Sequence, residues 1–463
     1  MLKIDAREKG WSKRCRKIIL SPANQTALKH FDTYYTHIFG ATAWCGIRVA
    51  LLTPPAKVAI LNAVNPDLQQ CLDEFHSKNY LDLFTELTKP IEEAQTSQKT
   101  QVTPPQQPKY KPESLFPNRQ FLIREDAVSE RLSEFVPATE FIGERVMYAR
   151  DSDKGYVLQS NSDMMMSDTI EIPVLKEDTN WMESFKNLKC MVLPTGTFSE
   201  LPRPKYNGNC YDFYPLDLGS VLAVLLLDVQ PETQMLDLCS APGGKAVVSL
   251  QTLNLKRLVC TDVSATRLER LRIVLNGFAW GIGRDRPGFP DVEVYSTPSL
   301  LRSSKIRSGQ LFSRILVDVP CSTDRDALTS VSGGYFARGK SSERINLPET
   351  QRRLLRHAMS LCDVGGYIVY STCTLSVAQN QEVIESCLST SNSTDNSSES
   401  DSFAVVDPTE FINLCATQLN PSLGISIVSA SRRDSGTPLG VLVIPRVAAN
   451  YGPTFMCKIK RVK

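Results

Sequence analysis

The chain has 463 residues, of which 42% are hydrophobic and 22% charged, as in globular proteins with a large buried core. Its formal net charge of +2 excludes a protein that binds polyanions through overall charge, so any contact with nucleic acid must use a local basic patch. No apolar stretch reaches the roughly 18 residues of a membrane-spanning helix. The 13 cysteines form no CxxC pair, which argues against a disulfide framework or a zinc site and favours a reducing compartment.

The amino-terminal segment is rich in lysine and arginine but also contains Asp5 and Glu8. Transit peptides are Arg-rich and poor in acidic residues, so this segment is interpreted equally well as a transit peptide or as a basic tail. Residues 25–80 are expected to be helical, because apolar and aromatic side chains recur at helical spacing. We expect these side chains to face a core rather than nucleic-acid bases. They are Leu28, Phe31, Tyr34, Tyr35 and Phe39.

Composition divides the chain into four parts. A helical region over 1–87 is followed by a proline-containing linker over 88–113. A variable α+β region over 114–200 comes next, and no chemistry is assigned to it. The catalytic domain covers 201–463 and contains a Ser-rich, low-complexity insert at 389–402 that is expected to be disordered and solvated.

From about residue 201, segments of strand length alternate with segments of helix length, beginning with a helix at 221–227. This alternation predicts an α/β fold with a doubly wound, mostly parallel sheet, preceded by the helical N-terminal extension. Ligands bind such sheets beyond the carboxyl ends of the strands. The strands are expected at 234–238, 257–261, 291–295, 313–318, 365–371 and 440–445.

A turn of small residues follows the first of these strands and ends in Gly243-Gly244-Lys245. Small residues let backbone N–H groups approach a ligand closely, and the next helix adds the positive end of its dipole. Asp262 ends the following strand, 19 residues after Gly243, and an acidic side chain near that spacing suits the two hydroxyls of a ribose. Taken alone, the turn is equally consistent with an ordinary strand-to-helix connection.

Two further strands end beside cysteines. Asp318 and Cys321 follow one strand and Cys373 follows the other, so all three are expected in the same cleft as the turn. A single cysteine is most often a small buried hydrophobe, but two of them at ligand-binding strand ends favour chemistry. A thiolate that adds to C6 of a pyrimidine makes C5 nucleophilic toward an electrophilic methyl group. Asp318 can hydrogen-bond the base edge, and the second thiol can assist loss of the C5 proton.

The residues 237–245, 318–321 and 371–374 together resemble the Sun family of RNA 5-methylcytosine methyltransferases. The resemblance is ordered and spans 201–463. Segments near the N-terminus, including 27–32 and 47–52, are similar to a branch of the family that methylates mitochondrial ribosomal RNA. Residues 85–190 carry no convincing similarity.

The resemblance implies a Rossmann-like methyltransferase fold that binds S-adenosyl-L-methionine. Asp262 would take the ribose, Arg267 would share its pocket, and Asp318 would lie between cofactor and base. Cys373 matches the family's nucleophile and Cys321 its release cysteine. DNA cytosine methyltransferases instead attack with the cysteine of a Pro-Cys pair, which makes Cys321 the alternative nucleophile. The cofactor-binding turn would consist of Cys239, Ser240, Ala241, Pro242, Gly243, Gly244 and Lys245.

One feature departs from the family pattern. The family usually carries Asp-Gly after the third strand, where Thr297-Pro298-Ser299 stands here, so a carboxylate that reads adenine is missing. This departure favours an alternative function, a ribosome-assembly factor that retains the fold but has weak or no catalysis. The intact Asp318, Cys321 and Cys373 favour the enzyme.

RNA contact is expected to use basic groups that bind phosphates without reading sequence. The first group contains Arg302, Lys305, Arg307 and Arg314. The second contains Arg338, Lys340, Arg344, Arg352, Arg353 and Arg356, with a solvated helix face as the equal alternative for 352–356. The resemblance further implies ribosomal RNA as substrate, a mitochondrial matrix location, no membrane, and a helical-repeat partner of the mitochondrial transcription termination factor family. It implies no metal.

Overall fold

The computed structural model describes residues 20–88, 172–177, 181–196, 201–278, 289–298, 311–392, 402–432 and 435–463. Several expectations fall outside these residues: the basic amino-terminal segment, nearly all of the linker at 88–113, and the greater part of the variable region. Residues 393–401 of the Ser-rich insert and the basic residues Arg302, Lys305 and Arg307 also fall outside them. None of the helices within the described ranges is both long and apolar enough to cross a membrane.

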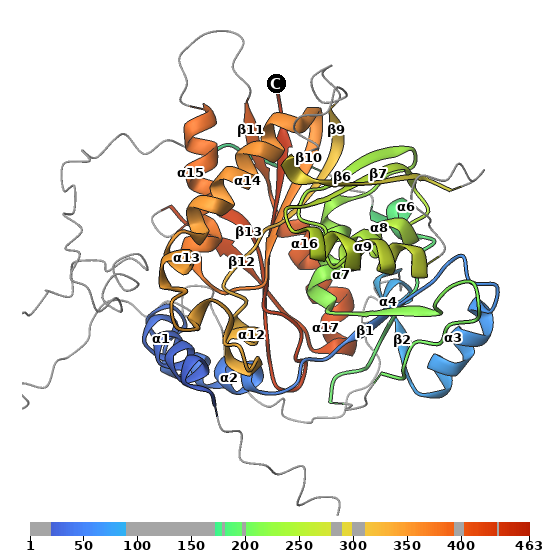
Figure 1. The fold of residues 1–463 in the computed structure, drawn as a ribbon, viewed down its shortest axis with the longest axis horizontal. Coiled ribbons are helices and arrows are strands. Elements are labelled where there is room, and N and C mark those ends of the chain that lie inside the picture. The colour runs from blue at the N-terminus through green and yellow to red at the C-terminus, as the bar shows by residue number, and fades with distance from the viewer. Residues whose placement is uncertain are drawn as a thin grey trace, which may run out of the picture.

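A ten-stranded sheet forms the centre of the molecule (Figure 1). One half consists of parallel strands in the order β10-β9-β6-β7-β8, with β8 at the edge, and the antiparallel strands β14, β13 and β12 continue the sheet beyond β10. The strands are β3 (Val174–Leu175), β6 (Thr233–Asp237), β7 (Leu255–Asp262), β8 (Asp291–Ser296), β9 (Phe312–Asp318), β10 (Cys362–Thr372), β11 (Phe403–Val406), β12 (Ser426–Ser431), β13 (Pro438–Ile444) and β14 (Thr454–Arg461). The predicted α/β class with a mostly parallel sheet is confirmed.

Helices cover both faces of this sheet because alternate strand residues point to opposite sides. Met235 and Leu316 belong to one core cluster, whereas their neighbours Leu236 and Ile315 belong to the other. The first cluster includes side chains of α7 (Leu218–Leu227), α8 (Gly244–Gln251) and α9 (Ala265–Gly277). The second includes side chains of α14 (Leu347–Leu361) and α15 (Gln381–Asn392). The helix predicted at 221–227 is therefore confirmed as the larger part of α7.

The N-terminal region is helical only in part. Helices α1 (Pro22–Phe39), α2 (Ala41–Leu52) and α3 (Leu68–Ser77) confirm much of the prediction for 25–80, but β1 (Val58–Leu61) interrupts it. The helical prediction is wrong there because β1 is an apolar run, Val-Ala-Ile-Leu, whose four residues are all buried between two neighbouring strands. The aromatic face of α1 is core as expected, since Phe31, Tyr34 and Tyr35 are buried.

A second, four-stranded antiparallel sheet joins three parts of the sequence. Its order is β2-β4-β1-β5. The strands β2 (Leu81–Asp82), β4 (Cys190–Val192) and β5 (Phe213–Leu216) come from the N-terminal, variable and catalytic regions respectively. The short helices α4 (Leu83–Thr88) and α6 (Trp181–Phe185) adjoin it in sequence. Strand pairing thus connects regions that composition separated, while the domain boundaries themselves remain predictions.

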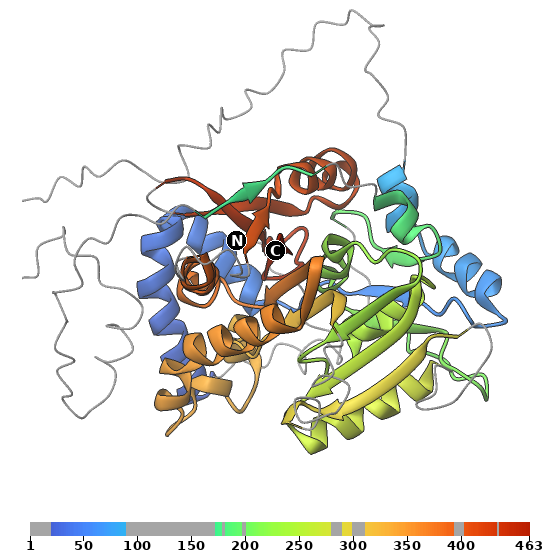
Figure 2. The same ribbon diagram turned by 90° about the horizontal axis from the view of Figure 1, so that it is seen from above.

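Helices α1 and α2 lie against the catalytic part of the chain, on the side of the orange helices in Figure 2. There they contact α12 (Asp324–Thr329), which follows directly from the Cys321 segment. The start of helix α1 is well defined, because Ser21 caps it, Asn24 completes a capping box, and Pro22 occupies the first turn. The small elements α13 (Ser341–Ile345), α16 (Thr409–Leu414) and α17 (Asn420–Leu423) complete the described helices.

Candidate active site

The small-residue turn connects the end of β6 to the start of α8. Gly243 adopts φ 113°, a left-handed conformation that side chains disfavour. A Cβ at Gly243 would lie 2.8 Å from Leu271 Cδ1, and one at Gly244 would lie 2.5 Å from Leu216 Cδ1. Ser240 N donates to Thr261 O at 2.8 Å, which fixes the turn against the end of β7. The two glycines are therefore required for the path of the chain, and the start of α8 faces the strand ends.

Two buried carboxylates lie beside this turn with unsatisfied oxygens. Asp237, at the end of β6, is fully buried; the Ser240 hydroxyl lies beside its carboxyl, but neither oxygen accepts a hydrogen bond of normal geometry from the described residues. Asp262, at the end of β7, accepts from Ser264 N at 3.0 Å through Oδ1, while its Oδ2 lacks a hydrogen bond within the same residues. Burial raises the pKa of Asp237 to about 7. Buried polar atoms normally have partners, so these oxygens are candidate contacts for a polar ligand.

Arg267 lies next to Asp262, as the sequence predicted. It stands in the first turn of α9, whose N-cap is Ser264. Its Nη2 atom donates to the carbonyl oxygen of Ala241 and lies 3.4 Å from Asp262 Oδ2. Arg267 therefore connects the turn to the end of β7 and places a positive charge beside the buried Asp262 carboxylate.

Asp318 joins the turn to the strand that carries Cys373. Its Oδ2 accepts from Lys245 Nζ at 2.7 Å, and its Oδ1 accepts from Ser371 Oγ at 2.8 Å. The parallel register of β9 and β10 places Asp318 opposite Ser371, two residues before Cys373. Two strong donors hold this carboxylate in one orientation between the turn and the thiols. The role of Ser371 was not anticipated, although its position just before Cys373 in the same strand end is a signal for it.

The two cysteines meet after β9 and β10. Cys321 Sγ lies 3.1 Å from Cys373 Sγ, and Cys373 N donates to Cys321 Sγ at 3.3 Å. Cys321 is 3% exposed, whereas Cys373 is exposed. The structure therefore brings the predicted pair together and gives solvent access to only one member. A planar ligand that enters from solvent reaches Cys373 first.

The surroundings of Cys373 favour the protonated form of its thiol. Its hydrogen bond with Cys321 and its desolvation raise the pKa well above the ordinary value, while the nearby Lys245 ammonium lowers it. Cys239, in the turn, also has a raised pKa because of burial and three neighbouring carboxylates. A thiol becomes a nucleophile only as a thiolate, so Cys373 must lose its proton when the substrate arrives.

The segment after β8 differs from the family pattern as the sequence indicated. Thr297 follows Ser296 of β8 and donates through Oγ1 to Thr261 Oγ1 at 3.5 Å. Ser299 lies outside the described residues. The Thr297 hydroxyl therefore makes a weak contact with the end of β7, at the place where the resemblance led us to expect a carboxylate.

The expectation that Arg314 and Arg344 contact RNA is wrong. Arg314 Nε donates to Asp228 O at 2.9 Å, and its guanidinium lies 4.6 Å from the ring centre of Tyr367. Arg344 is 2% exposed and packs over Phe336. Both are used internally because a guanidinium stacks well on an aromatic face. In the second basic group, the exposed members are Arg338, Lys340, Arg353 and Arg356.

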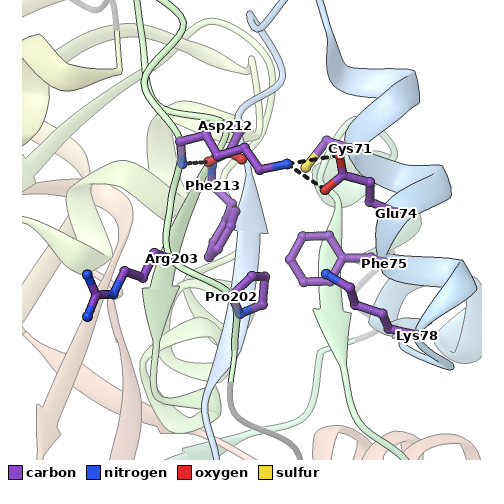
Figure 3. Close-up of a pocket in the computed structure, with 9 residues that line it drawn as sticks. Cys71, Glu74, Phe75, Lys78, Pro202, Arg203, Asp212 and Phe213 are labelled. Atoms are coloured by element: carbon purple, nitrogen blue, oxygen red, sulfur yellow. Dashed lines mark hydrogen bonds and ion pairs between the residues drawn. The ribbon is translucent and has the colours of Figure 1, made fainter.

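A small hollow in the second sheet is unrelated to these residues (Figure 3). It lies between α3 and β5, and its volume of about 10 Å³ is enough for about one water molecule. Lys205 and Glu74 form an ion pair of 2.8 Å at its rim. Burial raises the pKa of Cys71 in its wall to about 12, so that thiol is inert. The hollow is too small for a nucleotide or a cofactor.

Comparison with known proteins agrees with the geometry. The family model for the 16S rRNA methyltransferase RsmB/F matches residues 224–410, which contain the turn and both cysteines. The 5-cytosine rRNA methyltransferase NSUN4 of Xenopus laevis is 28% identical, and the match covers 98% of this chain and 94% of that protein. NSUN4 of Bos taurus is 35% identical over 60% of this chain and 67% of its own length. The crystal structure of NSun6 from Pyrococcus horikoshii shares the fold, with a TM-score of 0.50 at 15% identity over 94% of this chain and 98% of that one.

Proposed function

Because the chain belongs to the Sun family of RNA cytosine-5 methyltransferases, which use S-adenosyl-L-methionine, we propose that it methylates C5 of cytosine in mitochondrial small-subunit ribosomal RNA through a covalent cysteine adduct. The family membership concerns the reaction. The proposal concerns the substrate, the compartment and the part played by each residue.

The difference in exposure of the two thiols supports the covalent mechanism most directly. Cys373 is exposed and Cys321 is 3% exposed, with their sulfur atoms 3.1 Å apart. An incoming base meets Cys373 first, so Cys373 is the nucleophile that adds to C6. Cys321 lies directly behind it, within reach of the same ring edge, and takes part in removal of the C5 proton and release of the product. This assignment agrees with the family pattern and disfavours Cys321 as nucleophile.

Asp318 is suited to hold the base during this step. Lys245 and Ser371 each donate to one of its oxygens, so the carboxylate is fixed before the base arrives. A pre-oriented acceptor beside the ring edge stabilises charge that develops as the sulfur adds. The Lys245 ammonium lowers the pKa of Cys373, in opposition to the hydrogen bond with Cys321, desolvation and the nearby Asp318 carboxylate, which raise it, so Lys245 is the neighbour that favours the thiolate.

The residues around the turn fit S-adenosyl-L-methionine. The start of α8 directs backbone N–H groups toward the strand ends, and the buried carboxylates of Asp237 and Asp262 offer acceptors for hydroxyl and ammonium groups of the cofactor. Residues 239–245, together with Asp262, Arg267 and Asp318, would hold it. When bound, the cofactor supplies an electrophilic methyl group on a sulfonium.

Ribosomal RNA and mitochondria enter the proposal through resemblance and through the names of the NSUN4 relatives, which are rRNA methyltransferases. The basic amino-terminal segment is compatible with import but is interpreted equally well as a basic tail. A helical-repeat partner of the mitochondrial transcription termination factor family belongs to the same proposal. The described residues contain no separate RNA-binding module, which leaves RNA delivery to such a partner and to the exposed basic residues near α14.

The alternative function is a ribosome-assembly factor with weak or no catalysis, favoured by Thr297 at the place of the family's carboxylate. Calorimetric titration with S-adenosyl-L-methionine separates the two functions. We expect saturable binding, and no measurable binding at millimolar cofactor would favour the assembly factor.

The direct test is methyl transfer to a small-subunit ribosomal RNA transcript, with the methylated cytosine located by bisulfite sequencing. A mitochondrial transfer RNA transcript serves as the control substrate. We expect one cytosine of the ribosomal RNA to resist bisulfite conversion, and no cytosine of the transfer RNA to do so. Modification of the transfer RNA alone would contradict the proposed substrate. Recovery of the protein outside the mitochondrial fraction of cells would contradict the proposed compartment.

A further inference from the structure

A buried carboxylate connects the two cysteine segments. Asp324 is 0% exposed and lies three residues after Cys321, at the first position of α12. Its Oδ1 accepts from Thr374 Oγ1 at 2.6 Å and its Oδ2 accepts from Leu375 N at 2.8 Å, and both donors follow directly after Cys373. Ser322 Oγ lies 3.2 Å from Asp324 Oδ1. Asp324 therefore binds the residues that follow each cysteine.

The fourth donor to Asp324 comes from the N-terminal helix. Tyr35 Oη, on α1, donates to Asp324 Oδ2 at 2.8 Å across 289 positions of sequence, and Tyr35 is 1% exposed. Asn24, at the start of the same helix, donates to Ala327 O at 2.7 Å and to Ser330 O at 2.9 Å. These contacts hold α1 along α12, so the Tyr35 hydroxyl has a fixed position relative to Asp324.

The backbone beside Asp324 is strained. Thr323 has φ 48° and ψ 70°, a left-handed conformation that is unfavourable for a β-branched residue. Such a conformation is disfavoured and persists only where the surroundings hold it. Here Gln379 Oε1 accepts from Ser322 N at 2.9 Å on one side, and Asp324 is held by four donors on the other. The position of Cys321, two residues before Thr323, depends on this arrangement.

We propose that Asp324 and Tyr35 are positioning residues that set the separation of the Cys321 and Cys373 thiols, and that helix α1 is therefore part of the catalytic unit. The proposal extends the mechanism given above and rests on it. In that mechanism both sulfurs must face one edge of the same ring. Cys321, as a thiolate whose own proton has passed to solvent, takes the C5 proton; the electrons of the C5–H bond form the C5–C6 double bond, and the Cys373–C6 bond breaks with its electron pair returning to sulfur.

The first test measures thiol separation without the methylation reaction. A diazene-dicarboxamide oxidant removes two electrons and two protons from a thiol pair, giving a disulfide and a hydrazine. The rate of Cys321–Cys373 disulfide formation, followed by peptide mass spectrometry, is compared among the full-length wild type, Tyr35→Phe and Asp324→Asn. Tyr35→Phe keeps the buried ring and loses one hydrogen bond to a carboxylate. Asp324→Asn replaces an acceptor by an amide that opposes two of its donors.

We expect both variants to form this disulfide roughly tenfold more slowly, the change that corresponds to loss of one charge-assisted hydrogen bond. The matched control is Tyr34→Phe, which removes a hydroxyl from the same helix but not the one that donates to Asp324; it should oxidise at the wild-type rate. Thermal unfolding is measured for each protein. If Asp324→Asn does not fold, Tyr35→Phe decides the question alone. An unchanged disulfide rate in folded Tyr35→Phe overturns the proposal.

The second test uses the RNA reaction. Loss of positioning should lower kcat and raise the fraction of protein found covalently attached to RNA, while the KM for RNA and the cofactor Kd stay near wild type. A merely structural role would instead lower stability and leave kcat per folded molecule and the adduct fraction unchanged. If Cys373→Ala retains activity, the proposed mechanism fails whatever Tyr35→Phe does. If the cysteine variants behave as expected and Tyr35→Phe matches wild type, only the positioning proposal fails.

Discussion

The turn after β6 and the two cysteine segments lie at the same edge of one sheet, yet their polar groups are satisfied in opposite ways. Beside the turn, both oxygens of Asp237 and Oδ2 of Asp262 lack hydrogen bonds within the described residues. Beside the cysteines, Asp324 accepts from four donors. The first region is where we propose that the cofactor binds, whereas the polar groups of the second are already satisfied within the protein. Binding and chemistry are thus separated within a single site.

The largest effect should come from the cysteines themselves. Cys373→Ala is expected to abolish methyl transfer while leaving cofactor binding within a few-fold, because the thiol contacts the base. Cys321→Ala is expected to form the C6 adduct and to release it slowly, so its RNA should remain attached on a denaturing gel. The double variant should behave like Cys373→Ala. A nuclease-sensitive shifted band in Cys373→Ala, with none in Cys321→Ala, would reverse the two roles.

The next effect concerns the pH dependence of protein stability, through Asp237 beside the turn. The pKa of Asp237 is raised from 3.8 to about 7 by burial, so the folded protein holds a proton that the unfolded chain loses. Stability of the cofactor-free protein should therefore fall as pH rises from about 4 to 7, by up to about 4 kcal/mol. Asp237→Asn should flatten that slope in thermal unfolding followed across this pH range. A slope equal to that of wild type would show that Asp237 is not the titrating group.

A smaller effect is expected from Asp262, which would bind the ribose. Asp262→Ala should weaken cofactor binding by roughly 1.5–3 kcal/mol, the range for a hydrogen bond to a charged group. Calorimetric titration measures the change. Glu232→Ala, which alters an exposed carboxylate at the start of the strand that ends at Asp237, serves as control. An unchanged dissociation constant in Asp262→Ala would remove this residue from the site.

The smallest effect should come from the exposed arginines of α14. Arg353→Ala and Arg356→Ala should each weaken RNA binding a few-fold and lower the salt dependence of affinity by about one ion, without changing which cytosine is modified. Filter binding at several salt concentrations gives both quantities. Lys256→Ala, an exposed cation in β7, is the matched control. If Lys256→Ala loses as much affinity as the arginine variants, the effect reflects overall charge.

The sequence predicts the parallel half of the sheet well, because β6, β7, β9 and β10 are apolar runs followed by distinctive residues. Strands β12 and β14 were missed; the Lys and Arg residues of β14 hide its apolar pattern, even though Lys458 is buried. Strand β1 was predicted to be helical because its pairing partners, β4 and β5, lie more than a hundred positions away in the sequence.

The position of both cysteines at one edge follows from the rule for parallel strands, but their contact does not. A separation of 3.1 Å depends on Asp324, and the donor from Tyr35 comes from a helix that spacing identifies only as having an aromatic core face. The internal roles of Arg314 and Arg344 could not be predicted either, because the sequence around an arginine does not show which aromatic ring its guanidinium will stack on. Residue roles in catalysis stay predictions until the variants are measured.

The bond between Tyr35 and Asp324 also constrains when the site can form. Synthesis at 5–20 residues per second delivers Asp324 roughly 15–60 s after Tyr35. During that interval the face of α1 formed by Phe31, Tyr34 and Tyr35 can pack against Trp44 of α2 but not against α12, which has not been made. Asn450, which donates to Ala50 O at 2.9 Å, is delivered later still. The Tyr35 hydroxyl therefore gains its carboxylate partner only after the chain has been synthesised as far as residue 324.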